Sequence, residues 1–193
     1  MVQLEDPDLV CKSLQGDMKA FEVLIDRYKQ MVFTLACRII RNKEDAEEIA
    51  QDTFLKAHNA LETFKGESKF STWLYKIAYY RSLDQLKKKK RHISSVSLDQ
   101  YRPTDIKEMS GVLDELERQD LVRIVKAAIN RLNEEDSAIV TLFYFEELSI
   151  REIAEIVSLS PEVLKVRLFR SRKQLAILLS STLLKEKVTN YEH

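Results

Sequence analysis

The sequence predicts an all-α protein: two small helical domains joined by a flexible acidic linker, with a helix-turn-helix in the second domain. Glycine and proline number only three each among 193 residues, whereas sheet-rich folds need many such turn residues. Apolar residues recur at intervals of three and four through most of the chain, which is the period of an amphipathic helix. This recurrence weakens only between residues 93 and 120, where Ser, Pro and Gly interrupt an acidic stretch.

The first half of the chain predicts four helices, each with a recognisable start. Asp6-Pro7 begins the first, Asp17 or Gly16 begins the second, and Asn42 both stops the second and caps the third. A polar loop around Gly66 precedes the fourth helix. The expected helices span about 5–14, 17–41, 43–61 and 71–92.

The linker and the second half follow from charge and periodicity. Residues 93–120 hold three basic and seven acidic residues, a net charge of 3 − 7 = −4, which is typical of a partly disordered segment. Further helices are expected over about 121–132, 133–145, 149–157 and 161–184, and Asn133 can cap the second of these. We therefore expect an N-terminal domain over 1–92, a linker over 93–120 and a C-terminal domain over 121–193.

The overall composition limits the class of protein. There are 31 basic and 31 acidic residues, but they segregate into blocks, so the zero net charge does not exclude a nucleic-acid partner. Cys11 and Cys37 stand far apart and match no metal-binding spacing, which indicates reduced thiols. No signal peptide and no run of roughly 18 apolar residues is present. We expect a cytoplasmic protein without membrane insertion, cofactor, metal site or catalytic residues.

The strongest local pattern is a helix-turn-helix over residues 149–175. Ser149 and Glu152 have the spacing of a capping box, and Ser160-Pro161 begins the next helix. Between Lys165 and Lys173 this second helix carries five bases and no acid. A helix with one apolar stripe and a basic outer face fits the DNA major groove, although a basic helix packed on a partner protein is the plainer alternative.

A second pattern joins aromatic and basic residues just before the linker. Six aromatic residues fall within the 17 residues from Phe64 to Tyr80, and a Lys/Arg cluster follows them. Rings stack on unpaired bases and lysines follow phosphates, so this stretch suits melted DNA. Trp73 shares a face with Ile77 and is expected in the core, whereas Tyr75 and Tyr79 lie on another face that is expected to be exposed. The tetralysine run is equally well explained as a solvated helix end.

Together these patterns resemble a bacterial RNA polymerase sigma factor of the extracytoplasmic-function group, over nearly the whole chain. Residues 45–54 (DAEEIAQDTF) look like the family's helix that binds the clamp of core RNA polymerase. Residues 64–78 resemble its −10 segment, and residues 122–181 resemble its −35-binding domain. Tyr80, Ser158, Val166 and the Glu162-Val163 pair depart from the family's common residues. The resemblance implies promoter DNA, core RNA polymerase and an anti-sigma factor as partners.

The resemblance and the residue patterns together give three sets of candidate site residues. The set expected to bind polymerase is Asp45, Glu48, Gln51, Asp52 and Phe54. The set expected at the −10 element and in melting is Phe64, Lys65, Ser68, Trp73, Tyr75, Tyr79, Tyr80, Lys87 and Lys88. The set expected at the −35 element is Lys165, Val166, Arg167, Phe169, Arg170, Arg172 and Lys173.

Two other functions remain open at this stage. A one-component helix-turn-helix regulator would use its N-terminal domain to sense a ligand, but it leaves the aromatic-basic stretch without a role. A metal-dependent nuclease would use the carboxylates of one helix, since carboxylates at helical spacing can bind magnesium. No base or nucleophile accompanies them in the sequence. These carboxylates are Glu44, Glu47, Glu48 and Asp52.

Overall fold

A computed structural model gives the backbone of residues 4–93 and 113–190, and the side chains of 4–91 and 122–180. Within those residues the chain is helical and no strand occurs. The N-terminal unit contains α1 (Asp6–Leu14), α2 (Met18–Ile40), α3 (Lys43–Asn59), the short 3-10 turn η1 (Leu61–Thr63) and α4 (Phe70–Ile93). The C-terminal unit contains α5 (Leu113–Asn130), α6 (Glu134–Tyr144), α7 (Ile150–Val157) and α8 (Pro161–Asn190). The all-α prediction is confirmed.

The helix starts agree with the capping residues expected from the sequence. The Asp17 carboxylate accepts hydrogen bonds from the first backbone amides of α2. Asn42 and Asn133 accept from Asp45 N at 2.9 Å and Asp136 N at 2.8 Å, which begins α3 and α6. Each of these bonds satisfies a backbone donor that the first helical turn leaves unpaired.

One helix begins earlier than the periodicity indicated. Helix α5 starts at Leu113, inside the segment expected to be linker. Asp114, Glu115 and Glu117 stand in its first turns, where acidic residues favour helix formation through the helix dipole. Residues 94–112, the rest of the expected linker, lie outside the described residues.

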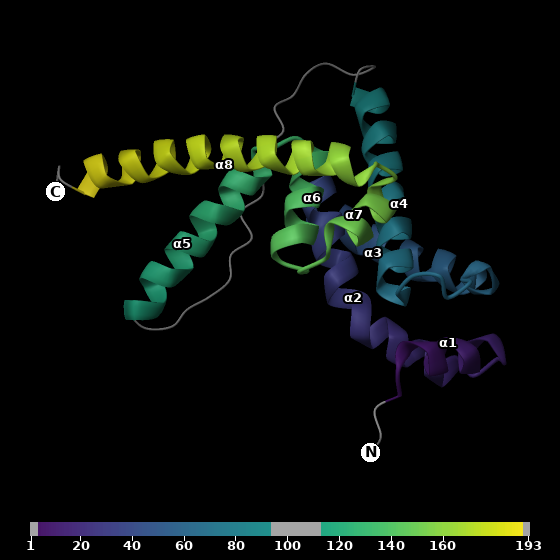
Figure 1. Cartoon of the computed structure of the whole chain (residues 1–193). Coiled ribbons are helices and arrows are strands. Elements are labelled where there is room, and N and C mark those ends of the chain that lie inside the picture. Colours follow the sequence, from purple (N-terminus) through teal and green to yellow (C-terminus); the bar gives the residue numbers. More distant parts are fainter. Residues whose placement is uncertain (1–3, 94–112, 191–193) are drawn as a thin grey trace.

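The two helical units pack against each other. Helix α6 lies on α2 and α7 lies on α4, while α8 crosses the C-terminal unit and its far half extends away from the body (Figure 1). The larger of two apolar core clusters among the described residues spans both units, from Leu24 and Leu74 in the first to Ile139 and Ile153 in the second. This packing brings the DNA-reading candidates of both units into one body, which the sequence did not predict.

Candidate nucleic-acid and polymerase interface

The helix-turn-helix has the geometry that its sequence predicted. Ser149 N donates to Glu152 Oε2 at 2.8 Å, and Glu152 N donates to Ser149 Oγ at 3.3 Å, which completes the capping box. In the turn, Ser158 has a φ of 54°. This left-handed conformation explains why glycine is common at the position, since a Cβ is disfavoured there. Ser160 Oγ then accepts from Val163 N at 3.3 Å and begins α8.

One face of α8 is exposed and carries both cations and apolar side chains. The spacing of its members, one and four residues apart, places them on one side of the helix. The opposite side, with Leu164 and Leu168, is buried against the core. Phe169 is 67% exposed and Val166 51% exposed, which is unusual for apolar residues in a packed protein. This reading face consists of Lys165, Val166, Phe169, Arg170 and Lys173.

Two arginines expected at the −35 element are instead engaged within the chain. Arg167 lies 2.6 Å from Glu135 Oε2 and 2.5 Å from Asp136 Oδ1, both at the start of α6. Arg172 stacks over the Phe143 ring, with its guanidinium carbon 5.2 Å from the centroid. These contacts hold α8 on α6, so in this arrangement both arginines help to position the reading face.

The aromatic residues before and at the start of α4 form a cluster of rings. The Phe64 centroid lies 5.6 Å from that of Phe70 and 5.5 Å from that of Trp73. Phe64 and Trp73 are half-buried and pack on the core, as expected for Trp73. The loop between them exposes Lys65, leaves Ser68 partly exposed and contains Gly66 with a φ of 72°.

Tyr75 and Tyr79 are buried, although the sequence had predicted that the helix face carrying them would be exposed. Tyr75 is 1% and Tyr79 3% exposed, because α7 of the C-terminal unit packs on α4. The Tyr75 hydroxyl donates to Glu146 Oε2 at 2.9 Å. Burial raises the pKa of both phenols, and the nearby carboxylates of Glu146 and Glu135 raise them further, so both stay protonated.

The remaining −10 candidates line the accessible part of α4. Tyr80 is 39% exposed, and its ring meets the Tyr79 ring edge to face at 5.3 Å. Lys87 and Lys88 are exposed about two turns further along the helix. Both lysines are accessible in the described arrangement, whereas Tyr75 and Tyr79 are not.

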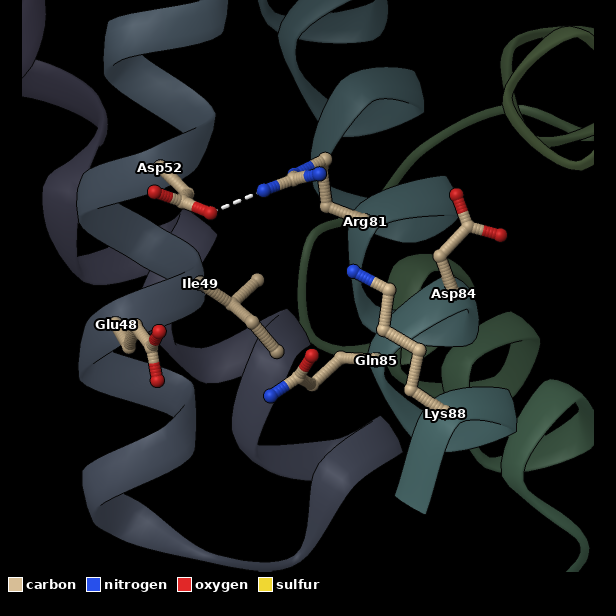
Figure 2. Close-up of a pocket in the computed structure, with 7 residues that line it drawn as sticks. All are labelled: Glu48, Ile49, Asp52, Arg81, Asp84, Gln85 and Lys88. Atoms are coloured by element: carbon tan, nitrogen blue, oxygen red, sulfur yellow. Dashed lines mark hydrogen bonds and ion pairs between the residues drawn. The ribbon is translucent and has the colours of Figure 1, made fainter. Parts of the chain in front are cut away.

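The candidate polymerase surface lies along α3 and faces α4 across a small recess. Glu48 and Asp52 line the recess from α3, and Arg81 and Lys88 line it from α4 (Figure 2). Asp52 pairs with Arg81, and Asp45 pairs with Lys89. These ion pairs fix the two helices and leave Glu48 and Gln51 as the exposed polar residues of the expected set.

Within the set expected to bind polymerase, Phe54 is buried, and its neighbour Leu55 is exposed. Phe54 is 8% exposed and belongs to the core, so its side chain cannot contact a partner directly. Leu55, the next residue, is 65% exposed beside Gln51 and Asp52. Sequence reasoning missed Leu55 because the apolar stripe of a helix is normally buried. The available signal was that Leu55 lies on the outer face of α3, whose other residues are mostly charged or polar.

The carboxylates considered for a nuclease are not gathered into a metal site. Among the residues whose side chains are described, no three His, Cys, Asp or Glu lie close enough together to hold a metal ion. Asp52 is paired with Arg81, and Glu47 lies 3.8 Å from Lys43. The described carboxylates therefore give the nuclease alternative no structural support.

Among the residues that the structure describes, every helix is too short or too polar to cross a bilayer.

Comparison with known protein families gives two matches along the chain. The family described as Sigma-70 region 2 matches residues 24–92, and the family described as Sigma-70, region 4 matches residues 123–175. The solved sigma factor RpoE of Bartonella quintana, in complex with the anti-sigma factor NepR, superposes with a TM-score of 0.69. That comparison covers 84% of this chain and 98% of the other at 22% identity, which shows a common fold. CnrH, solved with the cytosolic domain of CnrY, has a TM-score of 0.65 and 22% identity over 91% of this chain and 97% of the other.

Whole-chain relatives agree with both matches. The ECF RNA polymerase sigma-E factor of Haemophilus influenzae is 34% identical over 179 residues, 90% of this chain and 94% of the relative. The sigma-E factor of Escherichia coli K12 is 33% identical over 89% of this chain and 92% of the relative. SigW of Bacillus subtilis is 30% identical over 83% and 89%. The chain therefore belongs to the extracytoplasmic-function (ECF) family of RNA polymerase sigma factors.

Proposed function

We propose that this protein binds core RNA polymerase in the cytoplasm and directs it to promoters by contacting a −35 and a −10 element. The observation that carries the proposal is the reading face of α8: three exposed cations and two exposed apolar residues on the second helix of a helix-turn-helix. Cations there add salt-dependent affinity for phosphates, and an arginine on a guanine edge adds about 1–3 kcal/mol of discrimination. The protein itself needs no catalytic group in this role, because the polymerase supplies the chemistry.

The proposal divides the chain into two working parts. Residues 1–92 bind polymerase and hold the −10 strand, and residues 121–193 read the −35 duplex, with the segment 93–120 between them. The family matches at 24–92 and 123–175 support this division. In the first part, Phe64, Trp73 and Tyr80 offer ring surfaces beside the exposed lysines of α4, which suits unpaired bases and their phosphates.

For polymerase, we propose that α3 presents a small apolar anchor within a charged surface. Leu55 is exposed and is flanked by Glu48, Gln51 and Asp52. A buried apolar residue surrounded by polar contacts is the usual energetic centre of a protein interface. An anti-sigma factor is a further proposed partner, supported by the solved RpoE of Bartonella quintana, which is bound to the anti-sigma factor NepR.

The test is transcription in vitro with purified core polymerase on a library of genomic fragments, with start sites mapped by sequencing. We expect a discrete set of start sites that share two upstream elements. Arg170→Ala should lower their use about tenfold or more, whereas Lys126→Ala, which removes an exposed cation on α5, should leave it unchanged. A one-component regulator would bind promoter duplex unaided and would not redirect core polymerase. Start sites that do not respond to Arg170→Ala would contradict the role of the reading face.

A further inference from the structure

The outward side of α8 has an apolar centre. Helix α8 packs on α5, α6 and α7 through its other side, where Leu164 and Leu168 are buried. An α-helix turns by about 100° per residue, so Val166 lies about 160° around the axis from both of these leucines. Val166 is therefore the residue of the reading face that is set most directly away from the core, and its side chain is 51% exposed.

Phe169 extends this apolar centre, and cations border it. Phe169 stands one turn after Val166 and is exposed. Lys165 precedes the pair, Arg170 and Lys173 follow it, all three are exposed, and no acid stands between Lys165 and Lys173. A border of one sign matches the phosphate strands on the two sides of a DNA groove. The charge therefore indicates duplex DNA, rather than a protein, as the ligand that covers the two apolar side chains.

The chemistry of the two side chains limits what they can recognise in a groove. Neither Val166 nor Phe169 has a group that donates or accepts a hydrogen bond. The apolar feature on the floor of the major groove is the C5-methyl group of thymine, whereas the remaining base edges present donors and acceptors. An apolar side chain placed against such a donor or acceptor removes its water without replacing the hydrogen bond. The pair therefore favours thymine methyl groups and disfavours base pairs that present a polar edge there.

The spacing of the pair fixes how many base pairs it covers. Three residues rise about 4.5 Å along a helix axis, which is slightly more than the step of about 3.4 Å between base pairs. Val166 and Phe169 therefore suit neighbouring base pairs. Val166 also departs from the family's common residue, so the base preference at its position does not follow from family membership.

We infer that Val166 and Phe169 are specificity-determining residues that read the methyl groups of thymines on two adjacent base pairs of the −35 element. This inference rests on the proposed function for the duplex to which α8 binds. Arg170 and Lys173 hold the neighbouring base edges and phosphates, while the apolar pair selects the sequence between them. The upstream element of the promoters should accordingly contain thymine, on either strand, at two neighbouring base pairs.

Replacing thymine by uracil tests the inference, because uracil lacks only the methyl group and keeps the same hydrogen-bonding edge. The probe is a fluorescent duplex of a mapped promoter in which each thymine of the upstream element is replaced in turn. Its affinity for the complex of the full chain with core polymerase is measured by competition. A buried methyl group contributes about 0.8 kcal/mol, so we expect about fourfold weaker binding at two adjacent base pairs. No loss at any thymine would overturn the inference.

Protein variants then assign each methyl group to a side chain. Val166→Ser removes both valine methyl groups at an exposed position, so the fold is not disturbed. It should cancel the uracil effect at one of the two base pairs, and Phe169→Ser should cancel it at the other. The matched control is Val122→Ser, the same change at an exposed position of α5, which should keep both effects. Equal uracil effects in the wild type and in Val166→Ser would show that the methyl group acts through the shape of the DNA, and would overturn the inference.

A second probe separates the methyl group from the rest of the base. At the base pair assigned to Val166, thymine is replaced by cytosine or by 5-methylcytosine, which restores the methyl group on a cytosine edge. The wild type and Val122→Ser should bind the 5-methylcytosine duplex about fourfold more tightly than the cytosine duplex, and Val166→Ser should bind both equally. Equal binding of the two duplexes by the wild type would contradict methyl recognition.

Failure of the proposed function has a different signature. If the protein directs core polymerase to no start site, the proposed function is refuted, and the uracil series is made on the duplex that the full chain alone selects from a random pool. The same effects, and the same coupling to Val166, are expected there; selection of no duplex would overturn the inference as well. Start sites that depend on Arg170 but show no uracil effect would leave the function standing and overturn the inference. So would weaker polymerase binding by Val166→Ser in the absence of DNA, because this side chain would then contact protein.

Discussion

The division of work among the arginines of α8 gives the sharpest prediction. Arg167→Ala removes the partner of Asp136, whose side chain is 13% exposed, and of Glu135, which is 46% exposed. A hydrogen bond to a buried charged group contributes about 1.5–3 kcal/mol, whereas an exposed pair contributes about 0–1 kcal/mol. Asp136 keeps a bond from Asn133 Nδ2 at 2.6 Å, which limits the loss. We expect the free energy of unfolding to fall by about 2 kcal/mol, or a Tm lower by about 4–8 °C.

Arg170→Ala, one turn along, should behave in the opposite way. Its side chain is exposed on the reading face, so the free energy of unfolding should change by less than about 0.5 kcal/mol. Discrimination of the −35 element should fall about tenfold or more. Unfolding followed by circular dichroism in urea measures the first quantity, and transcription from templates with an intact or a mutated −35 element measures the second. An Arg167→Ala protein as stable as the wild type would refute the positioning role.

Three further predictions concern single residues. Ser158→Gly should raise the urea midpoint by an amount equivalent to about 0.5–1 kcal/mol, because it relieves the left-handed turn; a lowered midpoint would contradict this. Leu55→Asp should weaken polymerase binding at least tenfold in a fluorescence titration, whereas Glu62→Lys, on the nearby η1 turn, should not. Hydrogen bonds from Lys69 and then Ser149 lower the pKa of Glu152 to about 2, so its stabilisation is complete above about pH 4.5 and is lost as the pH falls toward 2. Glu152→Gln should flatten the dependence of the urea midpoint on pH over that range; an unchanged slope would contradict the assignment.

The sequence predicted features whose causes are local. The caps at Asp17, Asn42, Asn133 and Ser149 depend on residues within one turn, so their side-chain types suffice to place helix starts. The apolar stripe and basic face of α8 follow in the same way from helical spacing. The family resemblance added the roles of these parts, which periodicity alone does not contain.

Features that depend on the contact between the units were not predictable in this way. Tyrosine side chains such as those of Tyr75 and Tyr79 suit either a buried or an exposed helix face. Only the packing of α7 on α4 decides between the two. Arg167 is one of five bases on a short stretch, and its pairing with Asp136 depends on how α8 crosses α6. The early start of α5 was missed because acidic residues are typical both of linkers and of helix N-termini.

The central claim is that the chain brings polymerase to duplex DNA through α8 and captures an opened strand through the N-terminal unit. Permanganate oxidation of unstacked thymines in a mapped promoter tests it most directly. The account predicts reactive thymines around −10 only when this protein and core polymerase are both present, and their loss with Arg170→Ala but not with Lys126→Ala. Reactivity that is absent with both proteins, or that core polymerase produces alone, would contradict it.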